Sequence, residues 1–172
     1  VLADVLHRFG CEVKLLGNLP NLEILCAPLQ AIDIDTMAVS SFPIDTSPEE
    51  AIINCNEIIS HFQPDAIIFV ERPGMNAEGK YHNMSGENIS QLTGKADYLA
   101  TIAKEQKVLT IGIGDGGNEI GMGNIIETVK EQIPFGRECL CPCKKGIATI
   151  TTTDFLLAAT VSNWGAQALA AI

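Results

Sequence analysis

The sequence predicts an α/β fold in which a mostly parallel sheet is flanked by helices, a Rossmann-like three-layer arrangement, within a single α/β domain of residues 1–172. Two continuous apolar runs, Ala66–Val70 and 108–113, are typical of parallel strands covered on both faces. Helix-like patterns alternate with these runs, and that alternation favours a largely parallel sheet. A length of 172 residues suits one domain with a full hydrophobic core.

The first elements are short. Residues 1–9 place apolar side chains on one helical face, and Gly10 is expected to end that helix as the glycine just past its last turn. A strand over 13–16 should follow. Residues 18–46 show no clear period, so we expect short strands or loops there, with breaks at Pro20, Pro28 and Pro43.

The strongest helix start lies at Ser47. Ser47 is a good N-cap, Pro48 suits the first helical position, and Glu50 completes a capping box. This helix should end near Phe62, because Pro64 disfavours helical backbone in the residue before it.

The second half continues the alternation. We expect a helix around 96–103, the strand 108–113, and a helix over 120–132. Residues 147–153 alternate like a strand, and the apolar run 155–161 leads into an alanine-rich helix.

Three unusual polar stretches each follow a predicted strand and precede a helix: 71–84, 114–119 and 162–165. In a parallel sheet, all three lie at the carboxyl edge, where open α/β sheets bind their ligands. We therefore expect these stretches to converge on one site.

The most informative segment is 112–124, which contains six glycines around two carboxylates. Gly112, Gly114 and Gly117 fit the spacing of a dinucleotide loop, but Asp115 would face a pyrophosphate with the wrong charge. No Lys-Ser/Thr pair follows, so the segment is not a P-loop. Backbone donors beside carboxylates suit a zwitterionic amino acid better than a nucleotide.

Asp115 and Glu119 could bind an ammonium group, act as a base, or hold a divalent cation such as Mg²⁺ or Mn²⁺. The alternative is that they only cap a helix and interact with its dipole. Glu71 and Arg72 form either a salt bridge at the sheet edge or a pair in which Arg72 grips a substrate carboxylate. Candidate substrate-binding residues are Arg72, Tyr81, Asn83, Gly116, Gly117, Asn118, Ser162 and Asn163.

Other polar residues have simpler explanations. Ser162 is expected to be the N-cap of the last helix, His82 a surface histidine, and Trp164 either pocket lining or core. The run Cys139-Leu-Cys141-Pro-Cys143 lacks the usual zinc spacing. On a strand the three cysteines would share one face, and we interpret them as free structural thiols.

Charge and composition exclude some functions. The formal net charge of −10 argues against nucleic acid and anionic membranes as partners. No apolar run approaches the roughly 20 residues of a membrane span. Cys11, Cys26 and Cys55 lie in apolar segments, which favours a reducing, cytoplasmic compartment. Val1 is not an initiator Met, so we expect residues to be missing at one or both ends; homo-oligomerisation stays open.

The segment Gly114–Gly123, together with Glu71-Arg72 and Ser162–Gly165, resembles the D-glutamate cyclase family. These motifs occur in this order in the catalytic C-terminal region of the animal mitochondrial enzyme and recur in bacterial single-domain relatives. The stretch around Cys141-Pro-Cys143 is similar to the bacterial branch. The resemblance implies a hydro-lyase that converts D-glutamate into 5-oxo-D-proline and water, in the mitochondrial matrix if the chain is from an animal.

Chemistry then suggests roles. Asp115 is the preferred base with Glu119 second, Glu71 is an acid for the leaving oxygen, and Arg72 would hold the α-carboxylate. Backbone N–H groups of Gly116, Gly117 and Asn118 could stabilise the oxyanion. No cofactor is firmly implied. A dinucleotide-dependent oxidoreductase and a non-catalytic amino-acid-binding module are the alternatives.

Overall fold

Two parallel sheets form the framework of the computed structural model, which describes residues 1–18, 22–31, 38–44 and 46–172. The larger sheet has the strand order β3 (Ala66–Val70), β4 (Leu109–Gly114) and β5 (Phe155–Ala158). The smaller sheet pairs β1 (Lys14–Asn18) with β2 (Ala38–Phe42). The α/β class and the parallel pairing are thus confirmed.

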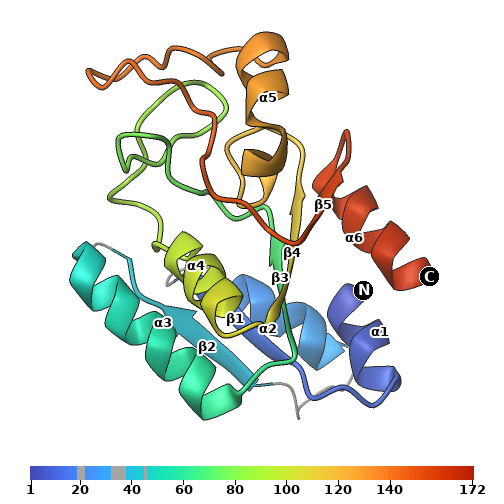
Figure 1. Cartoon of the computed structure of the whole chain (residues 1–172). Helices are drawn as coiled ribbons and strands as arrows, with labels where there is room; N and C mark the ends of the chain where they lie inside the picture. Colours follow the sequence, from blue (N-terminus) through green and yellow to red (C-terminus); the bar gives the residue numbers. More distant parts are fainter. Residues whose placement is uncertain (19–21, 32–37, 45) are drawn as a thin grey trace.

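The helices alternate with the strands along the chain, as the sequence predicts (Figure 1). They are α1 (Leu2–Arg8), α2 (Leu22–Ala31), α3 (Pro48–Phe62), α4 (Asp97–Glu105), α5 (Ile126–Gln132) and α6 (Ser162–Ala171), with a 3₁₀ turn η1 (Met122–Ile125) directly before α5.

Helices cover the larger sheet on both faces. Phe69 lies opposite Gly112 in the register of β3 and β4, and Phe69 packs in one core cluster with Leu99 of α4. Ile113 points to the other face, where Gly165 of α6 lies directly against its side chain. α3 packs beside α4, and α1 lies beside α6 (Figure 1). This is the three-layer arrangement expected from the sequence.

Local sequence signals explain the best-defined helix. The amide of Glu50 donates to the hydroxyl of Ser47 (3.1 Å), and the amide of Ser47 donates to the carboxylate of Glu50 (2.8 Å). This is the predicted capping box, and α3 ends at Phe62 as expected. Gly10 adopts a φ of 86° just beyond the C-cap of α1, a conformation that glycine tolerates best.

The long helix expected over 120–132 is wrong in its first half. Ile120 and Gly121 precede the 3₁₀ turn, and only α5 is α-helical. The amide of Ile120 donates to the carbonyl of Arg72 (2.8 Å). The segment therefore bonds to the loop after β3 rather than to its own next turn.

The strand expected over 147–153 is also wrong. This segment is irregular, and its polar backbone groups pair with loops: the Ile150 amide donates to the Met75 carbonyl (2.9 Å), and the Thr149 amide to that of Gly117 (3.3 Å). Burial does not alternate along the segment, because Ile147, Ala148 and Thr149 are all buried and Ile150 is exposed.

The prolines of the 18–46 region behave differently from one another. Pro28 lies inside α2 instead of breaking it, whereas Pro43 follows the end of β2. Pro20 lies outside the described residues. In the described part of the chain, no helix is both long and apolar enough to cross a membrane.

Candidate functional site

The three polar stretches after β3, β4 and β5 meet at the carboxyl edge of the larger sheet, as predicted. The first two pair through an antiparallel bridge between Pro73 and Glu119. The third joins them through the Ser162 amide, which donates to the carboxylate of Asp115 (3.1 Å). Parallel pairing of the strands thus brings sequence positions from 71 to 162 into one place.

Three carboxylates gather there, and we call Glu71, Asp115 and Glu119 the acidic cluster. One carboxylate oxygen of each lies within 4.8 Å of one from both others. Glu71 is exposed, Asp115 half-buried and Glu119 buried, so the cluster extends from solvent into the protein. Glu71 directly follows β3 with a φ of 54°, a conformation uncommon outside glycine.

Glu119 is the deepest member, with 3% of its surface exposed. Its two carboxylate oxygens accept hydrogen bonds from the amides of Gly116 (2.9 Å) and Gly117 (2.8 Å). Burial raises the pKa of Glu119 and the charge of Glu71 adds to that rise, although the two amide hydrogen bonds oppose it. The protonated form of Glu119 is therefore favoured relative to a solvated glutamate.

Asp115 connects the cluster to the start of α6 and to a small hollow. Its bond to the Ser162 amide uses one oxygen near the positive end of that helix. A hollow of about 140 Å³ lies beside it, lined by Asp115 and by mainly apolar residues such as Val129, Ile133 and Ala158. Asp115 is thus the one member of the acidic cluster that lines this hollow.

Arg72 extends the site toward the smaller sheet. Its guanidinium donates to the side-chain oxygen of Asn18 at the end of β1 (3.0 Å). Burial lowers the pKa of Arg72. In the structure Arg72 thus bonds to a neutral amide, which is neither the salt bridge with Glu71 nor a contact with a substrate carboxylate.

Two of the predicted binding residues, Tyr81 and Asn83, form hydrogen bonds within the structure away from the acidic cluster. The Tyr81 hydroxyl donates to the carboxylate of Asp97 in the core. The Asn83 side chain accepts from the amides of Ser85 (3.1 Å) and Glu87 (3.0 Å), which shapes its loop. The structure does not bring either side chain into the acidic cluster.

The stretch after β5 departs from expectation at two residues. Ser162 is the first residue of α6, with Val161 as N-cap, so the predicted N-cap role is wrong. The Ser162 hydroxyl is buried and has no hydrogen-bond partner among the described residues. Trp164 is 62% exposed, which contradicts a place in the core, and Asn163 is exposed beside it.

The glycines of the segment 112–124 allow this loop to pack closely against neighbouring atoms. A side-chain carbon on Gly112 would lie 2.4 Å from the carbonyl oxygen of Ile120, so the loop folds directly onto β4. Gly117 has a φ of 91°, which turns its amide toward Glu119. The amides that a pyrophosphate would need are bonded to a carboxylate, and the loop leads into a 3₁₀ turn rather than an α-helix. These features disfavour dinucleotide binding.

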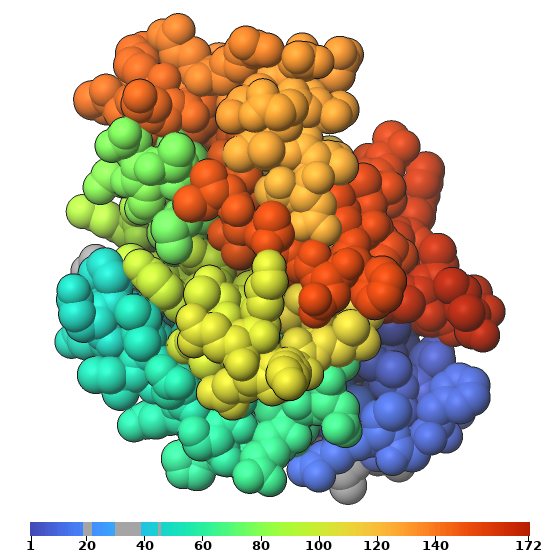
Figure 2. Space-filling model, in the orientation of Figure 1, coloured from blue at the N-terminus to red at the C-terminus, as the bar shows by residue number. Residues whose placement is uncertain are grey.

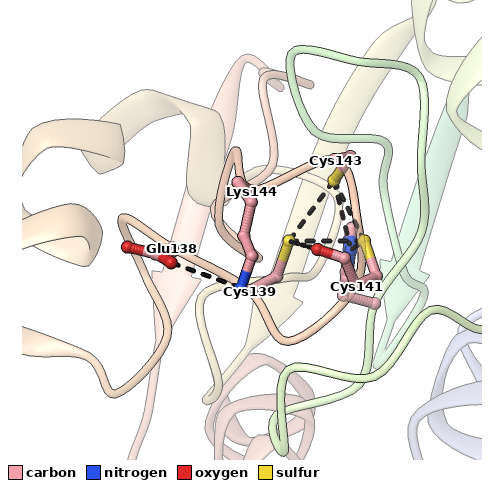
Figure 3. A network of polar contacts seen from close by, with 6 residues as sticks. Glu138, Cys139, Cys141, Cys143 and Lys144 are labelled. Atoms are coloured by element: carbon pink, nitrogen blue, oxygen red, sulfur yellow. Dashed lines mark hydrogen bonds and ion pairs between the residues drawn. The ribbon is translucent and has the colours of Figure 1, made fainter.

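A second cluster was missed by sequence reasoning. The residues 139–143 form a bend and turn rather than a strand, and their three thiols lie close together (Figure 3). A ring nitrogen of His82 lies within 4.8 Å of all three sulfur atoms. His82 is 1% exposed, so the expectation of a surface histidine is wrong. Burial lowers the pKa of His82, against a smaller opposite effect of the Lys80 backbone, which favours a neutral ring.

The fold and the acidic cluster define an α/β domain with three carboxylates gathered at the carboxyl edge of its parallel sheet. Comparison with known proteins gives the family. All of residues 1–172 match the family described as D-glutamate cyclase-like, C-terminal, and the chain belongs to this family. The human protein named D-glutamate cyclase, mitochondrial, is 38% identical over 107 residues, which are 62% of this chain and 16% of the human protein. The match thus spans a small part of the human relative's length.

Proposed function

We propose that the acidic cluster is the active site of a carbon–oxygen lyase that converts D-glutamate into 5-oxo-D-proline and water. The observation that carries the proposal is the gathering of three carboxylates at the carboxyl edge, beside a small hollow. Membership of the D-glutamate cyclase-like family and the name of the human relative support the same reaction.

The reaction requires two proton movements. The α-nitrogen forms a bond to the γ-carbon, and one γ-oxygen leaves. The ammonium group loses two protons in becoming the lactam N–H, and the departing oxygen gains both as water. A site for this chemistry needs a proton acceptor near the nitrogen and a proton donor near the γ-carboxyl group. Holding the two ends of the substrate together supplies much of the remaining rate enhancement.

The acidic cluster offers a division of these tasks. Asp115 is half-buried beside the hollow, so we assign it as the base that takes a proton from the ammonium group. Glu119, whose pKa is raised, suits the donor role at the leaving oxygen better than the exposed Glu71 does. Because oxygens of the three carboxylates lie within 4.8 Å of one another, a proton would pass between them through a single water.

Substrate binding is assigned to the residues around the cluster. Arg72 would hold the α-carboxylate after exchanging its bond to Asn18 for the ligand. Because Gly116 and Gly117 already donate to Glu119, we assign oxyanion stabilisation to the Asn118 amide and the buried Ser162 hydroxyl. Asn163, Tyr81 and Asn83 would act only by shaping the surrounding loops.

A divalent cation is an alternative use of the same cluster, in which the three carboxylates would be ionised ligands rather than a base and a proton donor. Three carboxylates offer the oxygen ligands that Mg²⁺ and Mn²⁺ prefer, and such an ion would neutralise the γ-carboxylate of the substrate. Turnover should then fall after treatment with a chelator and return with added Mg²⁺ or Mn²⁺. Turnover that is unchanged by the chelator would remove the cation from the proposal.

The direct test is incubation of the purified chain with D-glutamate and, separately, L-glutamate, followed by chromatography for 5-oxoproline. Asp115→Asn should abolish cyclisation, whereas Glu78→Gln, at an exposed position of the loop after β3, should leave it unchanged. Stabilisation by glutamate without product would indicate a binding module instead. Near-normal turnover of Asp115→Asn would remove Asp115 from the role of base.

A further inference from the structure

Four side chains outside the acidic cluster form a compact set of nitrogen and sulfur ligands. The sulfur atoms of Cys139, Cys141 and Cys143 lie 3.1–3.4 Å from one another. The Nε2 atom of His82 lies 3.2 Å from the sulfur of Cys141 and 3.8 Å from that of Cys143. Figure 3 shows the three sulfurs pointing toward a common centre.

These distances exclude a disulfide and favour a single ion. A disulfide bond is about 2.05 Å long, and three thiols would leave one without a partner. A cluster of several iron atoms distributes its thiolates over different metal atoms, which would hold the sulfurs further apart. Three thiols and an imidazole within 4.8 Å of one another instead enclose room for one metal centre.

The chemical types of these four ligands indicate which metal ion they would bind. Three cysteines and one histidine are a common tetrahedral set for structural zinc, and thiolates disfavour Mg²⁺ and Ca²⁺. A tetrahedron with Zn–S bonds of about 2.3 Å has sulfur–sulfur edges of about 3.8 Å. The observed edges are shorter, so binding would open the thiol triangle by roughly half an ångström.

The chain supplies a geometry that the spacing alone does not suggest. Cys141-Pro142-Cys143 lies in a tight turn closed by the Lys144 amide, which donates to the Cys141 carbonyl (3.3 Å). Lys144 has a φ of 53° and reverses the chain. This turn brings thiols separated by one residue onto the same side. The usual zinc motifs, which have two to four residues between their cysteines, use a longer loop for this purpose.

Polar groups around the cysteines also suit thiolates. The buried amide of Asn76 lies 3.6 Å from the sulfur of Cys143 and donates to the carbonyl of Gly146 (2.8 Å). Lys144 brings a positive charge to the surface side, where it pairs with Glu138 (3.3 Å). Such surrounding contacts orient metal ligands and stabilise their negative charge.

We propose that His82, Cys139, Cys141 and Cys143 bind one Zn²⁺ as a structural site. Four protein ligands leave no open position for a substrate, which separates this site from the acidic cluster. The site would join the loop after β3 to the segment 139–146; these segments lie together in the upper part of the molecule in Figure 2.

The zinc site also reaches the glycine-rich loop. The carbonyl of His82 accepts a hydrogen bond from the side chain of Asn118 (2.8 Å), the residue directly before Glu119. Bound zinc would therefore hold His82 in place, and the hydrogen bond from Asn118 to His82 would then hold the loop that carries Asp115 and Glu119. Loss of the metal should loosen that loop although no zinc ligand belongs to the cluster.

The test is the metal content of the chain, purified without an affinity tag that binds metals and analysed by mass spectrometry of the elements. We expect one zinc per chain in the parent protein, loss of zinc in Cys141→Ser, and full zinc in the control Cys11→Ser, which changes an exposed free cysteine. Iron or copper in place of zinc, or no metal at all, would overturn the proposal.

A second measurement remains informative if Cys141→Ser fails to fold. In the parent protein, a mercurial reagent should release one zinc per chain. Removal of zinc should make three further thiols reactive. Cobalt added to the metal-free chain should produce the charge-transfer absorption of a tetrahedral thiolate complex. Full thiol reactivity before metal removal, or absence of that absorption, would contradict a zinc site. None of these measurements depends on cyclase activity.

Discussion

Asp97 should make the stability of this chain depend on pH in a direction opposite to that of most carboxylates. Asp97 is 1% exposed, and its carboxylate accepts a hydrogen bond from the hydroxyl of Tyr81. Burial raises the pKa of Asp97 from 3.8 to about 6, and the hydrogen bond from Tyr81 opposes only part of that rise. The folded chain therefore holds this proton more tightly than the unfolded chain does.

The size of the effect follows from that shift. A pKa raised from 3.8 to about 6 corresponds to ~3 kcal/mol of differential interaction. Because the raised pKa belongs to an acid, the contribution to stability is fully present below about pH 4. It is lost as the pH rises through the folded pKa of about 6.

Asp97→Asn removes the titration and keeps an oxygen that can accept from Tyr81. We would measure the free energy of unfolding by urea denaturation of both chains between pH 4 and pH 7. The stability of the variant relative to the parent should rise by roughly 2–3 kcal/mol over this range. Asp65→Asn, at an exposed aspartate, serves as control and should show no comparable change. Parallel curves for Asp97→Asn and its parent would refute the reasoning.

Three further predictions concern single positions. Ser47→Ala should lower the free energy of unfolding by ~1 kcal/mol through loss of the capping box, whereas Ser85→Ala in an exposed loop should not. Gly112→Ala should destabilise by about 1–3 kcal/mol, because its new carbon meets the Ile120 carbonyl at 2.4 Å; an unchanged melting temperature would contradict this close approach. If protonated Glu119 is the donor, parent activity should fall as the pH rises through its raised pKa. Glu119→Gln should then lose about 10²–10⁴-fold in kcat without a corresponding change in KM.

The parts of the fold predicted well are those specified by local chemistry. Ser47 and Glu50 determine the start of α3 through bonds between neighbours in sequence, and the structure contains both bonds. The run Ala66–Val70 forms β3 with the expected bounds, since continuous apolar residues favour a parallel strand, although only Phe69 of this strand is fully buried. The convergence of the strand-end loops followed from topology, which holds whatever the residues in those loops are.

The errors arise where tertiary contacts replace local ones. The residue types over 147–153 alternate like those of a strand, but burial does not follow that pattern and loops supply the hydrogen-bond partners. Pro28 was expected to interrupt a segment that folds as α2. In such segments the local sequence pattern does not identify the tertiary contacts that determine the structure.

The cluster of thiols shows the same limit at a site. Cys141 and its histidine partner are 59 residues apart, so no short motif joins them. Three cysteines at alternate positions with an intervening proline were the available signal, because Pro142 favours a turn over a central strand. Combining that turn with the histidine in the polar stretch after β3 would have indicated a common ligand set.

The amides of the glycine-rich loop already donate to a carboxyl group of the same loop, that of Glu119. Two converging N–H groups form the usual beginning of a nest for phosphate or sulfate, and here Glu119 fills it from within the same loop. Shortening that side chain to alanine would expose the pair and should produce a chain that binds inorganic anions. In the parent chain, the Glu119 carboxyl group therefore occupies the position that an inorganic anion would need to reach these two amides.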